Sequence, residues 1–226
     1  MKMLRLRILL LHPVRNDRMK RIAKIIAFTA AFVLCAVMTV ACGVDYTEDE
    51  VKKAAAGLIE ASYEINEIYF GKGLPISEED SEEAKEFAKE NGLELENIQF
   101  LPVTEESPYK SIKDIKKAVA KVYSESYCEY LNLMAFEGFS TEDGSAAVYA
   151  KYIEDEKGVL TARVDLADKG IILNRTYDTS TIKAKKMKKD EVTFTVDSYV
   201  DGKKDETLTF KLVLESDGWR LDTPTY

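Results

Sequence analysis

The sequence contains almost no histidine, because His12 is the only one among its 226 residues. This residue precedes an apolar segment that we interpret as an export signal, so we expect it to be absent from the mature protein. A domain without imidazole cannot run a Ser-His-Asp or Cys-His mechanism and cannot build the usual zinc site. The shortage of histidine therefore excludes two large classes of hydrolase.

Cysteine is also scarce. Of the three cysteines, only Cys42 and Cys128 remain if the leader is cut after residue 41. We expect Cys42 to carry a lipid, which leaves Cys128 without an intrachain partner, so no disulfide framework is predicted despite the export. Cys128 is interpreted as a small buried apolar residue, and a reactive thiol is the alternative.

Positive charge is in deficit after the leader is removed. Residues 42–226 hold 24 of the 32 basic residues and 39 of the 40 acidic ones, a net charge of −15. Nucleic acids and anionic lipids need a basic face, so no nucleic-acid partner is expected. The acidic run at residues 78–83 lacks a calcium-loop pattern, and no metal ion or cofactor is predicted. The remaining length suffices for one domain with a proper core.

The longest apolar run in the sequence predicts export. Residues 19–43 begin with a short basic head and continue as an uncharged apolar segment that ends in small residues and Cys42. This is the layout of a bacterial signal peptide. The tetrapeptide TVAC at residues 39–42 resembles the lipobox of bacterial lipoproteins, in which the cysteine is lipidated and the chain is cut before it. We therefore predict a signal segment over residues 1–41 and a palmitate-type lipid anchor on Cys42 at the outer face of the cell membrane.

Two other interpretations of this segment stay open. Thr39 and Ala41 are small residues at the spacing that ordinary signal peptidase accepts, which would release a secreted protein. Alternatively, residues 25–44 form about 20 uncharged positions, just enough for a single uncleaved membrane span. A second start at Met19 suggests that residues 1–18 are an upstream misassignment, with an unusually long basic head as the alternative.

The mature chain divides into a helical region over residues 42–92 and an α+β domain over residues 93–226. A capping box at residues 47–50 and apolar residues at three-and-four spacing predict a helix over 48–70. A short acidic helix capped by Ser77 is expected next, through roughly residue 89.

The second region begins with helices and ends in strands. Helices are expected after Ser111 and over 125–135, and alternating apolar residues then predict strands over 145–153, 159–166, 171–177, 181–187, 192–200 and 207–215. The fold class is α+β, with N-terminal helices packed on an antiparallel sheet of about five or six strands.

Two segments of this region resemble known exported proteins. The sequence YKSIKDI at residues 109–115 opens a helix, and DGWRLD at residues 217–222 closes the chain. They are similar to small exported proteins of Gram-positive bacteria related to the DL-endopeptidase inhibitor family, and to the broader nuclear-transport-factor-2-like (cystatin-like) group. The resemblance covers roughly residues 109–226 and brings no catalytic motif. It implies a curved sheet around the helices and a binding or inhibitory module near the cell wall.

Three side chains of the expected strands are candidates for ligand binding. Arg163, Arg175 and Tyr177 could line the mouth of a cavity on the concave face of the sheet, although ion pairs across neighbouring strands would look the same in sequence. Five lysines between residues 183 and 189 could contact anionic wall polymers. Lysines along an edge strand also prevent aggregation, and that explanation is preferred.

The sequence thus favours a non-enzymatic, membrane-anchored extracytoplasmic module that binds or inhibits a cell-wall protein or polymer. Two alternatives stay open. One is a histidine-free hydrolase that cleaves wall glycan with two carboxylates about 5 to 10 Å apart. The other is a structural subunit of an envelope complex, which a large exposed apolar patch would support.

Overall fold

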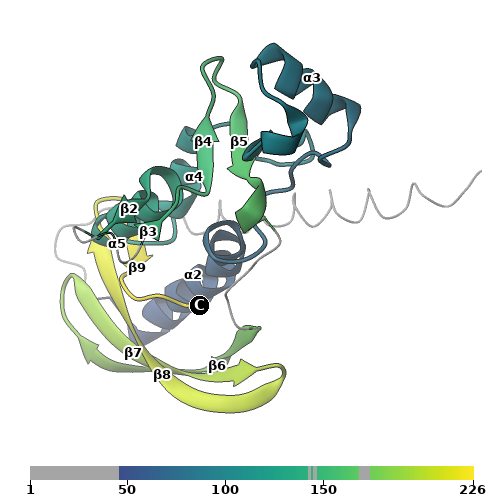
Figure 1. Ribbon diagram of the computed structural model, residues 1–226. Coiled ribbons are helices and arrows are strands. Elements are labelled where there is room, and N and C mark those ends of the chain that lie inside the picture. The colour runs from purple at the N-terminus through teal and green to yellow at the C-terminus, as the bar shows by residue number, and fades with distance from the viewer. Residues whose placement is uncertain (1–45, 142–143, 145–146, 168–173) are drawn as a thin grey trace, which may run out of the picture. The chain divides into compact units, whose positions relative to one another are not determined.

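The computed structural model describes residues 46–141, 144, 147–167 and 174–226 (Figure 1). All of these residues belong to one unit that runs from Ala41 to Tyr226. The predicted signal segment and the lipid site at Cys42 lie outside the described residues. Within the described ranges, no helix is both long and apolar enough to span a membrane.

The first described helix, α2 (Glu48–Tyr69), begins with the predicted capping box. The Glu50 amide donates to the Thr47 hydroxyl (3.3 Å), and the Thr47 amide donates to the Glu50 carboxylate (2.9 Å). Its buried face carries the predicted apolar stripe, including Val51, Ala55, Leu58, Ile65 and Tyr69. The helix predicted over 48–70 is therefore confirmed.

The next helix, α3 (Glu82–Glu90), begins later than expected. Its N-cap is Ser81, whose hydroxyl accepts from the amide of Ala84 (3.1 Å). The prediction of Ser77 as the cap was wrong because Ser77 is buried in an extended segment, where its amide donates to the carbonyl of Pro102 (3.0 Å). Pairing with the chain near residue 102 competes there with helix formation.

The helices of the second region begin at the predicted Ser111 and at Glu125, the predicted start of the next helix. Ser111 caps α4 (Ile112–Val119), and Ser124 caps α5 (Glu125–Asn132). The chain continues from α5 into a π-helical turn, η2 (Leu133–Glu137), which ends at Gly138 with φ +68°. A side chain at Gly138 would collide with the carbonyl oxygen of Val148, so only glycine allows this close approach to the chain at residues 148–150.

The described strands form three antiparallel sheets instead of one. The first sheet has the order β1 (Phe100–Pro102), β5 (Leu160–Arg163) and β4 (Tyr152–Glu154). The second pairs β2 (Phe139–Ser140) with β3 (Ala147–Val148). The third contains β6 (Arg175–Met187), β7 (Glu191–Val200), β8 (Lys203–Glu215) and β9 (Gly218–Leu221). Short 3-10 turns, η1 (Leu95–Asn97) and η3 (Val164–Leu166), precede β1 and follow β5. The α+β class is confirmed, whereas the largest described sheet has four strands and not five or six.

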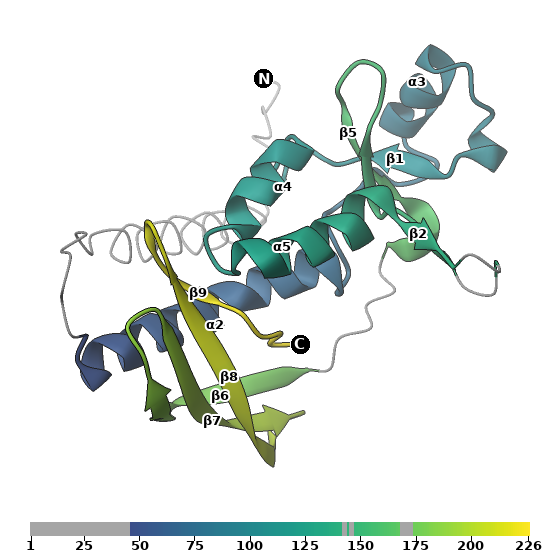
Figure 2. The ribbon, with the colours of Figure 1, turned by 90° about the vertical axis from the view of Figure 1, so that its left-hand side faces the viewer.

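The four-stranded sheet contains the strands that the sequence predicts best (Figure 2). Along β7, Val192, Phe194 and Val196 are buried in alternation with partly exposed neighbours. β6 is one strand where two were expected, because register shifts against β7 accommodate its extra residues without ending the strand. The expected start of that strand, at residues 171–173, lies outside the described residues.

A buried polar cluster joins α2, the turn after α4 and the C-terminal segment. It consists of Ser62, Asn66, Tyr123 and Thr225, each at most 3% exposed. The Asn66 side-chain amide donates to the Thr225 hydroxyl (2.9 Å), which donates to the Ser62 hydroxyl (2.7 Å). The Tyr123 hydroxyl donates to the Asn66 carbonyl oxygen (2.8 Å). These bonds hold residue 225 against α2.

Candidate functional site

The three predicted ligand-binding side chains do not meet in one place. Arg163 ends β5 in the three-stranded sheet, whereas Arg175 and Tyr177 lie two residues apart at the start of β6. The Arg163 guanidinium pairs with Asp165 (2.6 Å) and lies 4.4 Å from the ring centroid of Tyr149. Arg163 therefore belongs to a different neighbourhood from the other two.

Arg175 and Tyr177 are both engaged inside the fold. Arg175, with a side chain only 12% exposed, donates to the Ser198 hydroxyl (2.7 Å) and pairs with Asp205 (2.8 Å). The Tyr177 hydroxyl donates to the backbone carbonyl of Thr225 (2.9 Å). These contacts connect β6 to β7, to β8 and to the C-terminal segment.

The lysines between residues 183 and 189 lie on and just after β6, which is an edge strand of its described sheet. Lys183, Lys185 and Lys186 are exposed, and Lys188 pairs with Glu191 (2.9 Å). This placement fits the preferred explanation that charged side chains prevent edge-to-edge pairing.

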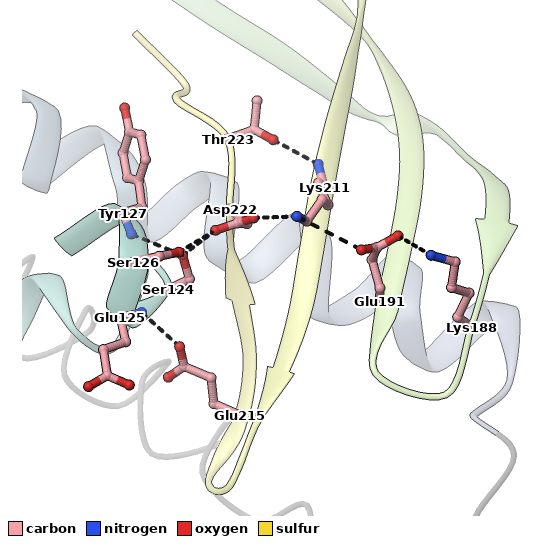
Figure 3. A network of polar contacts seen from close by, with 10 residues as sticks. All are labelled: Ser124, Glu125, Ser126, Tyr127, Lys188, Glu191, Lys211, Glu215, Asp222 and Thr223. Carbon is pink, nitrogen blue, oxygen red and sulfur yellow. Dashed lines mark hydrogen bonds and ion pairs between the residues drawn. The ribbon is translucent and has the colours of Figure 1, made fainter. Parts of the chain in front are cut away.

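A chain of polar contacts connects the start of α5 to β8 and β7 (Figure 3). Asp222 accepts hydrogen bonds from the hydroxyls of Ser124 and Ser126 and pairs with Lys211 (2.5 Å). Lys211 also lies 3.9 Å from Glu191. Burial alone would raise the pKa of Asp222, but the bonds from Lys211 and the two serines outweigh it and lower the pKa.

This network includes a serine next to a carboxylate, and so it is a candidate nucleophile site. The pKa of Asp222 is lowered, so its carboxylate is a weaker base toward the hydroxyl of Ser124 than an ordinary aspartate would be. That hydroxyl also accepts from the amide of Tyr127 (3.3 Å), which makes it the helix N-cap. The network is therefore a clamp between α5 and the sheet.

A pocket of about 150 Å³ lies at the C-terminal end of α2. Its walls come from the end of α2, from η2, from β3 and the residues between β3 and β4, and from η3. The π-helical turn that lines it is a type of irregularity found often at functional sites. Seven of the lining side chains are apolar or aromatic, and the eighth is a lysine: Tyr69, Phe70, Met134, Ala135, Val148, Tyr149, Leu166 and Lys151.

Lys151 is the charged residue of this pocket, and it is only 7% exposed. Its ammonium donates to the carbonyl of Gly71 (2.8 Å), just beyond α2, and lies 5.8 Å from the ring centroid of Tyr152. No carboxylate of the described residues forms an ion pair with it. Burial lowers the pKa of Lys151 to about 8, although Glu67 acts in the opposite direction. The negative end of the α2 dipole partly compensates the charge.

The turn after α2 holds this lysine in place. The Tyr152 hydroxyl donates to the carbonyl of Ile68 (2.8 Å) and accepts from the amide of Leu74 (3.0 Å), so it spans the turn. A side chain at Gly73 would lie 2.8 Å from Cε of Lys151. The turn thus closes directly over the lysine side chain.

Sequence reasoning did not identify this pocket. The only signal was a lysine within the apolar strand predicted over residues 145–153, and a single charge in a strand is commonly solvent-exposed. Its burial follows from the position of the α2 end, which no local pattern reveals.

The remaining candidates are structural. Cys128 is buried and its thiol donates to the carbonyl of Tyr123 (3.4 Å), which confirms the interpretation as a small buried residue. Burial raises the pKa of the thiol to about 12. In the ranges that the structure describes, no three His, Cys, Asp or Glu side chains are grouped to hold a metal ion.

No protein-family model matches the chain, and no curated protein is significantly similar to it.

Proposed function

We propose that this protein is a non-enzymatic binding module that uses the pocket at the end of α2 as its ligand site. The observation that carries this proposal is the combination of an aromatic wall with one buried cation, Lys151, at a cavity of about 150 Å³. Apolar walls with one well-placed polar group are characteristic of small-molecule sites. The module acts outside the cell membrane, near the cell wall.

The geometry favours binding over hydrolysis. Glycoside cleavage needs two carboxylates that flank a cleft. None of the side chains that line the pocket is a carboxylate, and Ser124 in the clamp is a helix N-cap whose neighbouring carboxylate, Asp222, has a lowered pKa. The pocket therefore supports the binding module over the histidine-free hydrolase.

An aromatic row beside the pocket supports a wall protein or polymer as the larger partner. Tyr226 stacks on the pocket residue Phe70, with 3.8 Å between ring centroids, and its hydroxyl lies 2.9 Å from that of Tyr127. Tyr130, which is 49% exposed, follows at 6.3 Å from Tyr127. Exposed aromatic rings of this kind serve as contact surfaces in binding proteins. An inhibitory role, as the resemblance to the DL-endopeptidase inhibitor family implies, would use this row.

We propose that Cys42 carries a lipid that anchors the protein to the membrane surface. In the same proposal α2 is the helical cover of the curved β6–β9 sheet, and the hydrogen bond from the Tyr177 amide to the Tyr63 hydroxyl (3.0 Å) supports this arrangement. We expect labelled palmitate to enter the native protein and to be lost in Cys42→Ala but not in Cys35→Ala. Equal labelling of all three proteins would contradict lipid attachment at Cys42.

The pocket is tested with a neutral aromatic probe, benzyl alcohol, in a titration followed by NMR chemical shifts. We expect saturable binding to the wild type and loss of binding in Met134→Trp, because the larger side chain fills the pocket. Leu133→Trp is the matched control, since Leu133 lies on the same helical turn but outside the lining. Binding that survives Met134→Trp, or no binding to the wild type, would contradict the proposed site.

A further inference from the structure

The ammonium of Lys151 is a buried charge that the described chain compensates only in part. The structure gives it one hydrogen bond, to the carbonyl of Gly71, although an ammonium has three N–H donors. A buried ion that lacks an opposite charge destabilises the fold, because the protein does not replace the water that the charge has lost. A methionine of similar length would fill the same space without this cost.

The second feature is the size of the pocket. A cavity of about 150 Å³ with apolar walls is large enough to hold a single benzene ring. Tyr69 and Phe70 form one wall, and Tyr149, which is 59% exposed, stands at the rim. One ring or one short branched chain fits this space, with the rest of the ligand outside it.

The third feature is the number of charges. No arginine and no second lysine is among the eight lining residues. Glu67 interacts with Lys151 through space, but its carboxylate accepts a hydrogen bond from the amide of Lys72 (3.4 Å). One cation in an apolar site matches a monoanion, whereas a phosphate or sulfate group is held by several donors. These observations favour a carboxylate.

We propose that the pocket binds a small amphipathic carboxylate, whose ring or branched chain packs against Tyr69 and Phe70 and whose carboxylate pairs with the ammonium of Lys151. This inference rests on the proposed function and names the ligand class of the same site. The anion supplies the opposite charge that the described residues lack, and the aromatic wall supplies the apolar contact.

Phenylacetate and its neutral isostere phenylacetamide test the inference, with dissociation constants measured by NMR titration at pH 7. We expect phenylacetate to bind at least tenfold more tightly to the wild type. We expect Lys151→Met to bind phenylacetate at least tenfold more weakly than the wild type does, and to bind phenylacetamide with the affinity of the wild type. Lys72→Met is the matched control, because Lys72 is an exposed lysine on the same turn, and we expect it to bind both probes as the wild type does.

Two sources could present such a carboxylate, a free small acid or the C-terminus of a peptide. The peptide Gly-Gly-Phe and its C-terminal amide separate them. If Gly-Gly-Phe binds as tightly as phenylacetate and its amide binds at least tenfold more weakly, the pocket accepts peptide C-termini. If Gly-Gly-Phe binds much more weakly than phenylacetate, the ligand is a free acid. Either result supports the carboxylate.

The outcomes separate this inference from the proposed function. Equal affinities of the wild type for phenylacetate and phenylacetamide would overturn the role of Lys151 and leave the pocket as a binding site. Tighter binding of phenyl phosphate than of phenylacetate would overturn the carboxylate as the ligand group. Absence of binding by every aromatic probe would overturn the proposed site as well. Lys151→Gln provides a second variant that removes the charge while keeping a polar side chain.

Discussion

Thr225→Val is expected to reduce the free energy of unfolding by about 3 kcal/mol, because each buried polar group that loses its partner costs roughly 1–3 kcal/mol. The Thr225 hydroxyl accepts from the amide of Asn66, donates to Ser62 and lies 2.8 Å from the hydroxyl of Tyr123. Valine has the same shape but offers no hydrogen bond, so three groups lose a contact. Ser62 and Tyr123 each retain one hydrogen bond, to Ile59 and Asn66, which limits the loss.

Urea unfolding at pH 7 measures this effect. Thr209→Val is the matched control, because Thr209 is an exposed residue of β8, and we expect it to change the stability by less than about 0.5 kcal/mol. Ser62→Ala combined with Thr225→Val should cost less than the sum of the two single changes, since both break the same bond. A loss below about 1 kcal/mol for Thr225→Val would mean that water satisfies the cluster, contrary to its burial.

The parts of the fold that the sequence predicts are those with local causes. The start of α2 depends on Thr47 and Glu50, three residues apart, and its buried face follows the helical period. The strand β7 follows a period of two, so its core side was evident. The start of α3 was misplaced because Ser77 and Ser81 both precede acidic residues, and only the distant carbonyl of Pro102 selects between them.

The candidate site depends on contacts that no local pattern contains. Arg163 and Arg175 were grouped because both occur in strands, but the order of strands in space assigns them to different sheets. No sequence pattern singles out Lys151. Its hydrogen-bond partner, the carbonyl of Gly71 just beyond α2, lies 80 residues earlier in the chain. Strand pairing and the burial of one lysine are decided by long-range packing.

The stability of the wild type relative to Lys151→Met is expected to rise with pH. Burial lowers the pKa of Lys151 to about 8 in the folded protein, against an ordinary value of 10.5 that applies to the unfolded chain. Between these values the unfolded chain holds a proton that the folded protein has released, so raising the pH favours the folded state. From pH 8 to 9.5 the gain is about 1.6 kcal/mol, because half of the folded protein still holds the proton at pH 8 and the full slope of about 1.36 kcal/mol per pH unit is reached only at higher pH.

The free energy of unfolding of both proteins is measured in urea at pH 7, 8, 9 and 9.5, and their difference isolates Lys151 from the tyrosines that also titrate at high pH. At pH 7 we expect Lys151→Met to be at least as stable as the wild type, because it lacks the buried charge. Lys85→Met is the control: the hydrogen bond with Glu82 raises the pKa of Lys85, which stays charged in both states, so its difference from the wild type should not change with pH. If the difference in the free energy of unfolding between the wild type and Lys151→Met also does not change with pH, water reaches the ammonium of Lys151. The pocket would then need no anion to neutralise that charge.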